Sequence, residues 1–206
     1  MTCAAHVQAG GQGFPGQLGV WDDRHLEGLT RLAAAIRAQD SVSSVQLHHA
    51  GIRSPKEIVG DVVGPSDDKD TGGRALTTAE VEKLRDDFIA AAKRAEKAGF
   101  DGVEVHGAHG YILAQFLSPE FNRRDDVYGG ALENRARLIF EIVNGIRAAC
   151  RPDFQLGIRL SPERFGLKLA EIRDVAAELL ADAKIDFLDM SLWDVKKEPV
   201  EEEFHG

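Results

Sequence analysis

Several polar and ionisable residues of this chain stand at the ends of short apolar runs. They are, in chain order, Gln46, His48, His49, His106, His109, Tyr111 and Arg159. An imidazole or an amide can hydrogen-bond a polarised oxygen, a phenol can donate a proton, and a guanidinium supplies a fixed positive charge. A single histidine or tyrosine in such a position is more often structural than catalytic. Their recurrence at comparable positions predicts one shared pocket, provided that the runs are neighbouring parallel strands.

The elements that must position these residues alternate along the chain. Apolar runs at residues 42–47, 100–105, 154–160 and 185–192 have the length and composition of buried strands. Helical periodicity precedes or separates them, over about residues 23–36, 77–98, 133–149 and 169–181. Repeated strand and helix units of this kind predict a parallel sheet with helices packed against it.

The helix between the first two runs has the clearest sequence signals. Thr77 and Glu80 have the spacing of a capping box, which predicts the start of the helix. Gly99 is placed as the residue just past its end. The apolar residues between these ends form one stripe, which consists of Val81, Leu84, Phe88, Ala91 and Ala95.

Two architectures are compatible with the alternation, an open doubly wound sheet and a (β/α)8 barrel. Residues 50–76 and 107–132, which follow the first two strands, are much longer than the turns that lead into the strands, as at the catalytic face of a barrel. No G-x-G-x-x-G motif follows a strand, which weakens the dinucleotide-fold interpretation. We therefore predict an α/β fold that is an incomplete (β/α)8 barrel of about four parallel strands, forming one partial domain over residues 1–206. Residues 1–20 are rich in glycine and predict a loop.

Four strands would leave two unpaired sheet edges, which natural proteins avoid. We therefore expect that further strands of the barrel, or another chain such as a second copy, cover these edges.

Composition narrows the class of protein. Hydrophobic residues make up 43% and charged residues 29% of the chain, which is typical of a soluble globular protein. The formal charge of −9 and the lack of a Lys/Arg-rich run argue against a nucleic-acid partner. No apolar stretch is long enough to span a bilayer and no signal peptide is evident, so we expect a cytoplasmic protein without membrane contact. Cys3 and Cys150 have no metal-binding or redox spacing.

Four segments of the chain resemble the old yellow enzyme family, which is also described as the NADH:flavin oxidoreductase family. The most specific of them is residues 99–119, GFDGVEVHGAHGYILAQFLSP, and a second is residues 122–135, NRRDDVYGGALENR. Residues 45–51, VQLHHAG, resemble the third strand of the family's barrel, and residues 157–161, GIRLS, resemble its fifth. The resemblance implies an FMN-dependent barrel in which the predicted strands are equivalent to strands 3–6.

The resemblance also implies a reaction and roles for five residues. A nicotinamide nucleotide, NADH or NADPH, reduces FMN, and hydride then passes to an electron-poor alkene or a similar small acceptor. His106 and His109 hydrogen-bond the substrate's carbonyl or nitro oxygen, as an oxyanion site does. Tyr111 donates a proton to the α-carbon. Gln46 hydrogen-bonds the pyrimidine edge of the flavin, and the positive charge of Arg159 favours the anionic reduced flavin.

The sequence departs from the family pattern in two respects. Ile52 separates Gly51 from Arg53, where the family motif continues from glycine directly to arginine, so we assign no role to Arg53. The family's strands 1 and 2, and strands 7 and 8 with the FMN phosphate site, have no counterpart in the predicted elements. The alternative hypothesis is therefore a truncated, non-catalytic remnant that does not hold FMN by itself.

A third hypothesis is a metal-dependent barrel hydrolase. It would use His48, His106 and His109 as ligands together with a carboxylate from Asp189 or Asp194. We prefer the flavin interpretation and assign no metal ligand. The polar residues Tyr128, Glu133, Asn134 and Arg135 and the glycines 129 and 130 are expected to order the long connection around them rather than to act on a substrate.

Overall fold

One parallel sheet organises the molecule. The computed structural model describes residues 1–181, 184–192 and 194–205. Within these ranges, five strands form the sheet in the order β1-β2-β5-β6-β7, so that neighbours in the sheet also follow one another in this order along the chain. The strands are β1 (Ala4–His6), β2 (Ser44–His48), β5 (Gly102–Gly107), β6 (Gln155–Leu160) and β7 (Phe187–Met190). This order and the parallel pairing are those of successive βα units in a barrel wall.

The N-terminal segment differs from the expectation. Residues 1–20 were predicted to form a loop, which is wrong at Ala4–His6, because these residues pair in parallel with β2 through Ala4–Gln46 and His6–His48. A three-residue strand flanked by glycine-rich sequence is too short to show an alternating pattern, so its partner strand determines it. The sheet therefore has five described strands rather than four. β1 occupies the place beside the strand that resembles the family's third, so the prediction that the second strand has no counterpart is also wrong.

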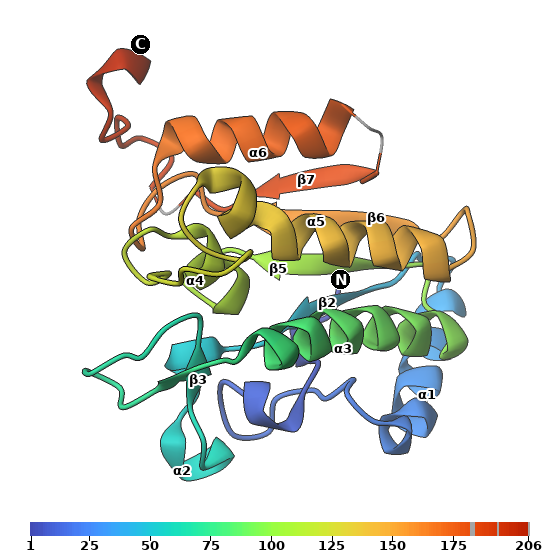
Figure 1. The fold of residues 1–206 in the computed structure, drawn as a ribbon. Helices are drawn as coiled ribbons and strands as arrows, with labels where there is room; N and C mark the ends of the chain where they lie inside the picture. Colours follow the sequence, from blue (N-terminus) through green and yellow to red (C-terminus); the bar gives the residue numbers. More distant parts are fainter. Residues whose placement is uncertain (182–183, 193, 206) are drawn as a thin grey trace.

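Four helices cover one face of the sheet (Figure 1). They are α1 (Leu26–Arg37), α3 (Thr78–Lys97), α5 (Leu132–Ala149) and α6 (Leu169–Ala181), and each packs against the next in this order. The capping box between Thr77 and Glu80 is confirmed at the start of α3. Gly99 follows the end of α3 with a φ of +93°, a conformation that suits glycine.

The strands have an apolar face and a polar face. Val103 and Val105 of β5 are completely buried on the face toward the helices. Glu104 and His106 point to the opposite face, because side chains alternate along a strand. In a closed barrel this second face is the interior. The polar face therefore carries the residues that the sequence singled out.

The long connections at the carboxyl ends of β2 and β5 contain short elements that were not predicted. The first holds α2 (Lys56–Val59) and a two-stranded sheet of β3 (Val63–Gly64) and β4 (Arg74–Ala75). The second holds α4 (Ile112–Leu117). In Figure 1 these elements lie at the end of the sheet to which the strand arrows point.

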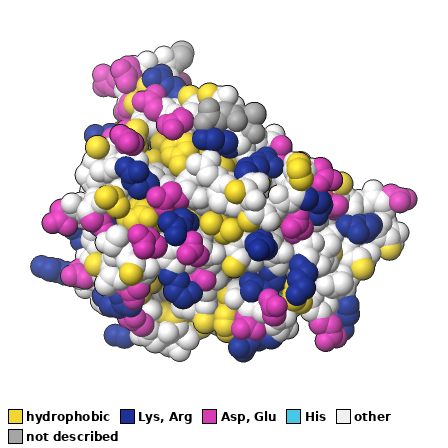
Figure 2. Space-filling model, turned by 45° about the vertical axis from the view of Figure 1, so that its right-hand side comes forward, with side chains coloured by type: hydrophobic (Ala, Val, Ile, Leu, Met, Phe, Trp, Pro, Cys, Tyr) yellow, Lys and Arg dark blue, Asp and Glu magenta, His cyan; other side chains and the backbone are white. Residues whose placement is uncertain are grey.

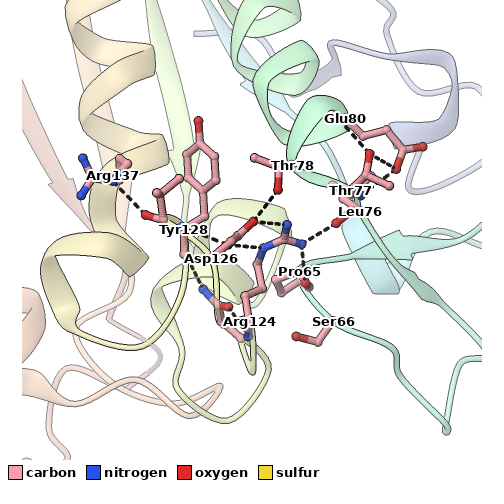
Figure 3. Close-up of polar contacts among 12 residues, drawn as sticks. Pro65, Ser66, Leu76, Thr77, Thr78, Glu80, Arg124, Asp126, Tyr128 and Arg137 are labelled. Carbon is pink, nitrogen blue, oxygen red and sulfur yellow. Dashed lines mark hydrogen bonds and ion pairs between the residues drawn. The ribbon is translucent and has the colours of Figure 1, made fainter.

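Arg124 joins the two long connections (Figure 3). Its guanidinium pairs with Asp126, with 2.6 Å between Nη2 and Oδ2, and donates to the carbonyl oxygens of Pro65 and Leu76. Asp126 in turn accepts a hydrogen bond of 2.7 Å from the hydroxyl of Thr78 in α3. These contacts fix both connections to the start of α3.

Residues 128–135 stabilise the second connection, as predicted from the sequence. The hydroxyl of Tyr128 donates to Glu141 in α5. A Cβ at Gly129 would lie 2.2 Å from the carbonyl oxygen of Arg124, so the close approach of the two segments requires glycine there. Arg135 is 4% exposed, donates to the carbonyl oxygens of Leu117 and Gly130 and pairs with Glu171 of α6.

The outer surface mixes both signs of charge. Lysine and arginine side chains alternate with aspartate and glutamate on the face shown in Figure 2, with hydrophobic side chains between them. Among the described residues, none of the helices combines the length and the apolar character needed to span a bilayer.

Candidate active site

Four aromatic side chains from the ends of β2 and β5 lie in one cluster. The ring of Tyr111 is 4.4 Å from that of His48 and 5.2 Å from that of His106, measured between centroids. The rings of His106 and His109 are 5.0 Å apart. The structure thus brings together the residues to which the sequence assigned hydrogen bonding and proton donation.

Arg159 on β6 lies beside His106 on the neighbouring strand β5. The two residues are partners in the register between β5 and β6, and Asp189 of β7 is the next partner of Arg159. Arg159 Nε is 3.2 Å from Asp189 Oδ2. The guanidinium is therefore held on the polar face of the sheet, one strand away from the histidines.

The backbone of His109 is fixed on both sides. Its N–H donates to Ser161 Oγ at 3.0 Å, and its carbonyl oxygen accepts a hydrogen bond from Arg53. The residue has a φ of +61°, an uncommon conformation for a non-glycine residue. Such a backbone is maintained only where its surroundings determine it, so these contacts preorganise the imidazole.

Burial keeps the clustered histidines neutral. Burial lowers the pKa of His106 well below its usual 6.5 and that of His48 to about 3, since a charged imidazole loses its hydration there. The pKa of His109 is also lowered, first by burial and then by the charge of Arg159. At neutral pH each ring therefore has one N–H donor and one acceptor nitrogen.

Local hydrogen bonds determine which nitrogen carries the proton. The N–H of Ala108 donates to His106 Nδ1 at 3.3 Å. The amide of Gln17, whose Nε2 also donates to the carbonyl of Ala4, lies 3.0 Å from His48 Nδ1. Since Nδ1 accepts in both rings, the proton of each neutral ring is on Nε2. His106 and His48 are therefore hydrogen-bond donors through Nε2.

Tyr111 directly precedes α4 and lies beside the histidines. The guanidinium carbon of Arg53 is 5.0 Å from the centre of its ring, and the same group is 5.8 Å from the ring of Phe165. Among the described residues, no hydrogen-bond partner of the Tyr111 hydroxyl is present. A phenol in this position can donate its proton to a bound molecule.

Gln46 lies one layer deeper on the same polar face. It precedes His48 by two residues on β2 and is the register partner of Glu104 in β5, to which its amide donates at 3.4 Å. Glu104 is completely buried, which raises the pKa of its carboxyl. Its Oε2 and the Nε2 of His48 are buried without a hydrogen-bond partner among the described residues.

These polar atoms suit a flavin. Buried polar groups normally have partners, so the unpartnered nitrogen of His48 calls for an acceptor on this face. The pyrimidine edge of a flavin presents both acceptors and a donor, which an amide such as that of Gln46 can satisfy. The guanidinium of Arg159 adds a positive charge for an electron-rich ring. The donors present on the polar face therefore fit FMN.

A cavity of about 510 Å³ opens beside His109. Its wall comes from the connection after β6 and from the segment after β7, and includes Ser161, Phe165 and Ser191. A cavity of this size can take a small molecule. It gives such a molecule access to the histidine cluster.

The metal-site hypothesis lacks its ligand set. Among the residues that the structure describes, no group of three or more His, Cys, Asp or Glu side chains is arranged to hold a metal ion. The carboxylate of Asp189 pairs with Arg159.

Sequence reasoning missed three residues of the site. Arg53 contacts both Tyr111 and His109, although the shifted motif gave it no role. Glu104 lies beside Gln46, and Ser191 contacts His109. Ser191 follows the last strand directly, so the rule that found the histidines, a polar residue at a strand end, could have found it too.

Comparison with known proteins agrees with this geometry. The model of the NADH:flavin oxidoreductase / NADH oxidase family matches residues 1–203. The chain belongs to this family. The cofactors predicted from the sequence, FMN with NADH or NADPH as reductant, are those that the family uses.

Individual relatives support the assignment. The chain is 44% identical, over 95% of its length, to the probable NADH-dependent flavin oxidoreductase YqiG of Bacillus subtilis (strain 168). It is 36% identical, over 91% of this chain, to an NADPH dehydrogenase of Geobacillus sp. (strain WCH70). The matched parts are 55% and 56% of these relatives, so the chain spans about half their length.

Solved structures show the same fold. An old yellow enzyme homologue from Zymomonas mobilis matches with a TM-score of 0.82 and 33% identity, over 91% of this chain and 58% of that chain. Morphinone reductase in complex with tetrahydroNAD matches with a TM-score of 0.81 and 32% identity, over 91% of this chain and 59% of that chain. These relatives are barrels, which confirms the fold class predicted from the sequence.

Proposed function

We propose that this chain carries the substrate-facing part of an FMN-dependent NAD(P)H oxidoreductase of the ene-reductase type. The observation that carries the proposal is the pair of neutral histidines, His106 and His109, beside Tyr111 and next to an open cavity. The substrate class follows from what these groups can do. They can bind one polarised oxygen and protonate a neighbouring carbon.

His106 and His109 would hold the carbonyl or nitro oxygen of an electron-poor alkene. A neutral imidazole can donate one hydrogen bond without placing a full charge in the site. Negative charge develops on this oxygen when hydride adds to the β-carbon, and preorganised donors stabilise such charge most strongly where water is excluded. The burial of His106 and the fixed backbone of His109 supply this preorganisation.

Tyr111 would deliver the proton that completes the reaction. Hydride addition at the β-carbon leaves an electron pair at the α-carbon. A phenol, which is protonated at neutral pH, can donate its proton to this carbon. The product is then the saturated compound, with one hydrogen added to each carbon of the double bond.

Gln46, His48 and Arg159 would hold FMN on the polar face of the sheet. When bound, FMN would carry the hydride, and NADH or NADPH would reduce the flavin again. The amide of Gln46 would hydrogen-bond the pyrimidine edge. Arg159 would provide the positive charge that offsets the negative charge of the reduced ring.

The test is an FMN titration of the purified protein, followed by flavin absorbance and fluorescence. We expect binding with a perturbed flavin spectrum, and Arg159→Met should weaken it about 10- to 100-fold, since a hydrogen bond to a charged group contributes about 1.5–3 kcal/mol. Arg31→Met, at an exposed position on α1, is the matched control and should bind like the wild type. A folded protein that does not bind FMN would overturn the proposal and favour the non-catalytic alternative.

A further inference from the structure

Ser191 lies at the junction of two residues of the proposed site. It directly follows β7, and its Oγ is 2.5 Å from His109 Nε2 and 3.3 Å from Arg159 Nη2. Its backbone is fixed, because its N–H donates to the carbonyl oxygen of Leu160 at 2.8 Å. Ser191 and His109 both line the 510 Å³ cavity.

The direction of the hydrogen bond between His109 and Ser191 follows from its neighbours. His106 Nδ1 accepts from the backbone N–H of Ala108, so the proton of the neutral ring is on His106 Nε2. This nitrogen is 3.3 Å from His109 Nδ1 and must be the donor in that contact. The proton of neutral His109 is then on Nε2, which donates to Ser191 Oγ.

Ser191 is therefore the last acceptor in a series of hydrogen bonds that all run in one direction. This series of hydrogen bonds runs from Ala108 through His106 and His109 to Ser191, and the direction of each bond depends on the direction of the one before. Arg159 Nη2–H also donates to Ser191 Oγ, so this oxygen accepts in both contacts through its two lone pairs and its own hydrogen is directed elsewhere.

We propose that Ser191 is a positioning residue for His109, a role that rests on the proposed function of the site. In the protein without substrate it accepts the Nε2–H of His109 and keeps the donor end of the imidazole at the wall of the cavity. A substrate oxygen that enters the cavity then meets a donor of the correct tautomer. Because the backbone of His109 is held by Ser161 and Arg53, only its imidazole has to turn toward the substrate oxygen, and this turn frees the N–H of His106 as well as that of His109.

The test is a nuclear magnetic resonance measurement on protein labelled with ¹⁵N-histidine, in the absence of substrate. Two-bond ¹H–¹⁵N spectra report which nitrogen of each ring carries the proton. We expect the Nε2–H form for His109 and a downfield Nε2–H resonance that exchanges slowly with water. Ser191→Ala should move this resonance upfield and raise its exchange rate about tenfold or more, on the scale of one lost hydrogen bond.

Two further variants separate positioning from a general structural effect. Ser191→Thr retains the hydroxyl and should preserve the resonance. Ser41→Ala removes an exposed hydroxyl that only contacts the carbonyl oxygen of Gln39, and it should leave the His109 signal unchanged. An Nδ1–H form of His109 in the wild type, or a resonance that does not respond to Ser191→Ala, would overturn the proposal. Because the measurement needs neither FMN nor turnover, its outcome is independent of the proposed reaction.

Discussion

Replacing Asp126 by asparagine removes one charge from the network that holds the two long connections together. The carboxylate makes two bonds to Arg124, from Nη2 at 2.6 Å and from Nε at 2.9 Å. It also accepts from the hydroxyl of Thr78 at 2.7 Å and from the N–H of Tyr128 at 3.1 Å. The asparagine side chain has the same shape but turns an NH₂ group toward one of these donors.

The expected cost follows from the burial of the pair. The side chain of Arg124 is 9% exposed and that of Asp126 is 24% exposed. Removing one partner of a fully buried ion pair costs about 3–5 kcal/mol. Asparagine still accepts with its remaining oxygen, and Asp126 is partly solvated. We therefore expect the free energy of unfolding to fall by about 2–3 kcal/mol at pH 7.

The dependence on pH gives a second readout. The hydrogen bonds from Arg124, followed by those from Thr78 and Tyr128, lower the pKa of Asp126. A carboxyl group with a lowered pKa in the folded state stabilises it at every pH above the unfolded value of about 3.9, and this contribution is lost as the pH falls further. The difference between the wild type and Asp126→Asn should therefore be largest above pH 4 and decrease below it.

The assay is urea unfolding followed by circular dichroism at several pH values. Asp125→Asn is the matched control, because it removes the same charge from an exposed neighbouring residue. It should change the free energy of unfolding by less than about 0.5 kcal/mol. Equal stability of the two variants, or a difference that grows below pH 4, would refute the reasoning.

Two further predictions concern stability. Thr77→Ala removes the side chain that accepts the N–H of Glu80 at the start of α3 and should cost about 0.5–2 kcal/mol in urea unfolding, whereas Thr77→Ser should cost less. His48 and His106 should stay neutral in histidine titrations by nuclear magnetic resonance down to at least pH 5, because burial lowers both pKa values. Since the unfolded value is about 6.5, the stability of the protein should decrease as the pH falls below 6.5, and a normal titration near pH 6.5 would contradict the site geometry.

The sequence predicted an element well where residues of that element itself mark its start and its end. The helix α3 was found at both ends because Thr77 and Glu80 cap it and Gly99 follows it. The strand β1 was missed because three residues hold too little pattern, and its pairing with β2 is a property of the sheet. Strand character that depends on a distant partner is not visible in a short segment.

The site was predictable to the extent that strand ends define it. His106 and Tyr111 meet His48 because parallel strands bring their carboxyl ends to one edge. The contacts of Arg53 with Tyr111 depend on the path of an irregular connection, which no periodicity describes. The direction of the hydrogen bond to Ser191 likewise depends on contacts between the end of β5, the loop that follows it and the residue after β7.

The most direct test of the proposed chemistry is the formation of cyclohexanone from 2-cyclohexenone by reduced, FMN-loaded protein in a single anaerobic turnover. Tyr111→Phe removes the proposed proton donor and should slow formation of the saturated product about 10²- to 10⁴-fold, the usual contribution of a general acid. Tyr128→Phe removes the hydroxyl of the other tyrosine, which bonds Glu141 away from the cluster, and should form the product like the wild type. Product formation by Tyr111→Phe at the wild-type rate would contradict the account.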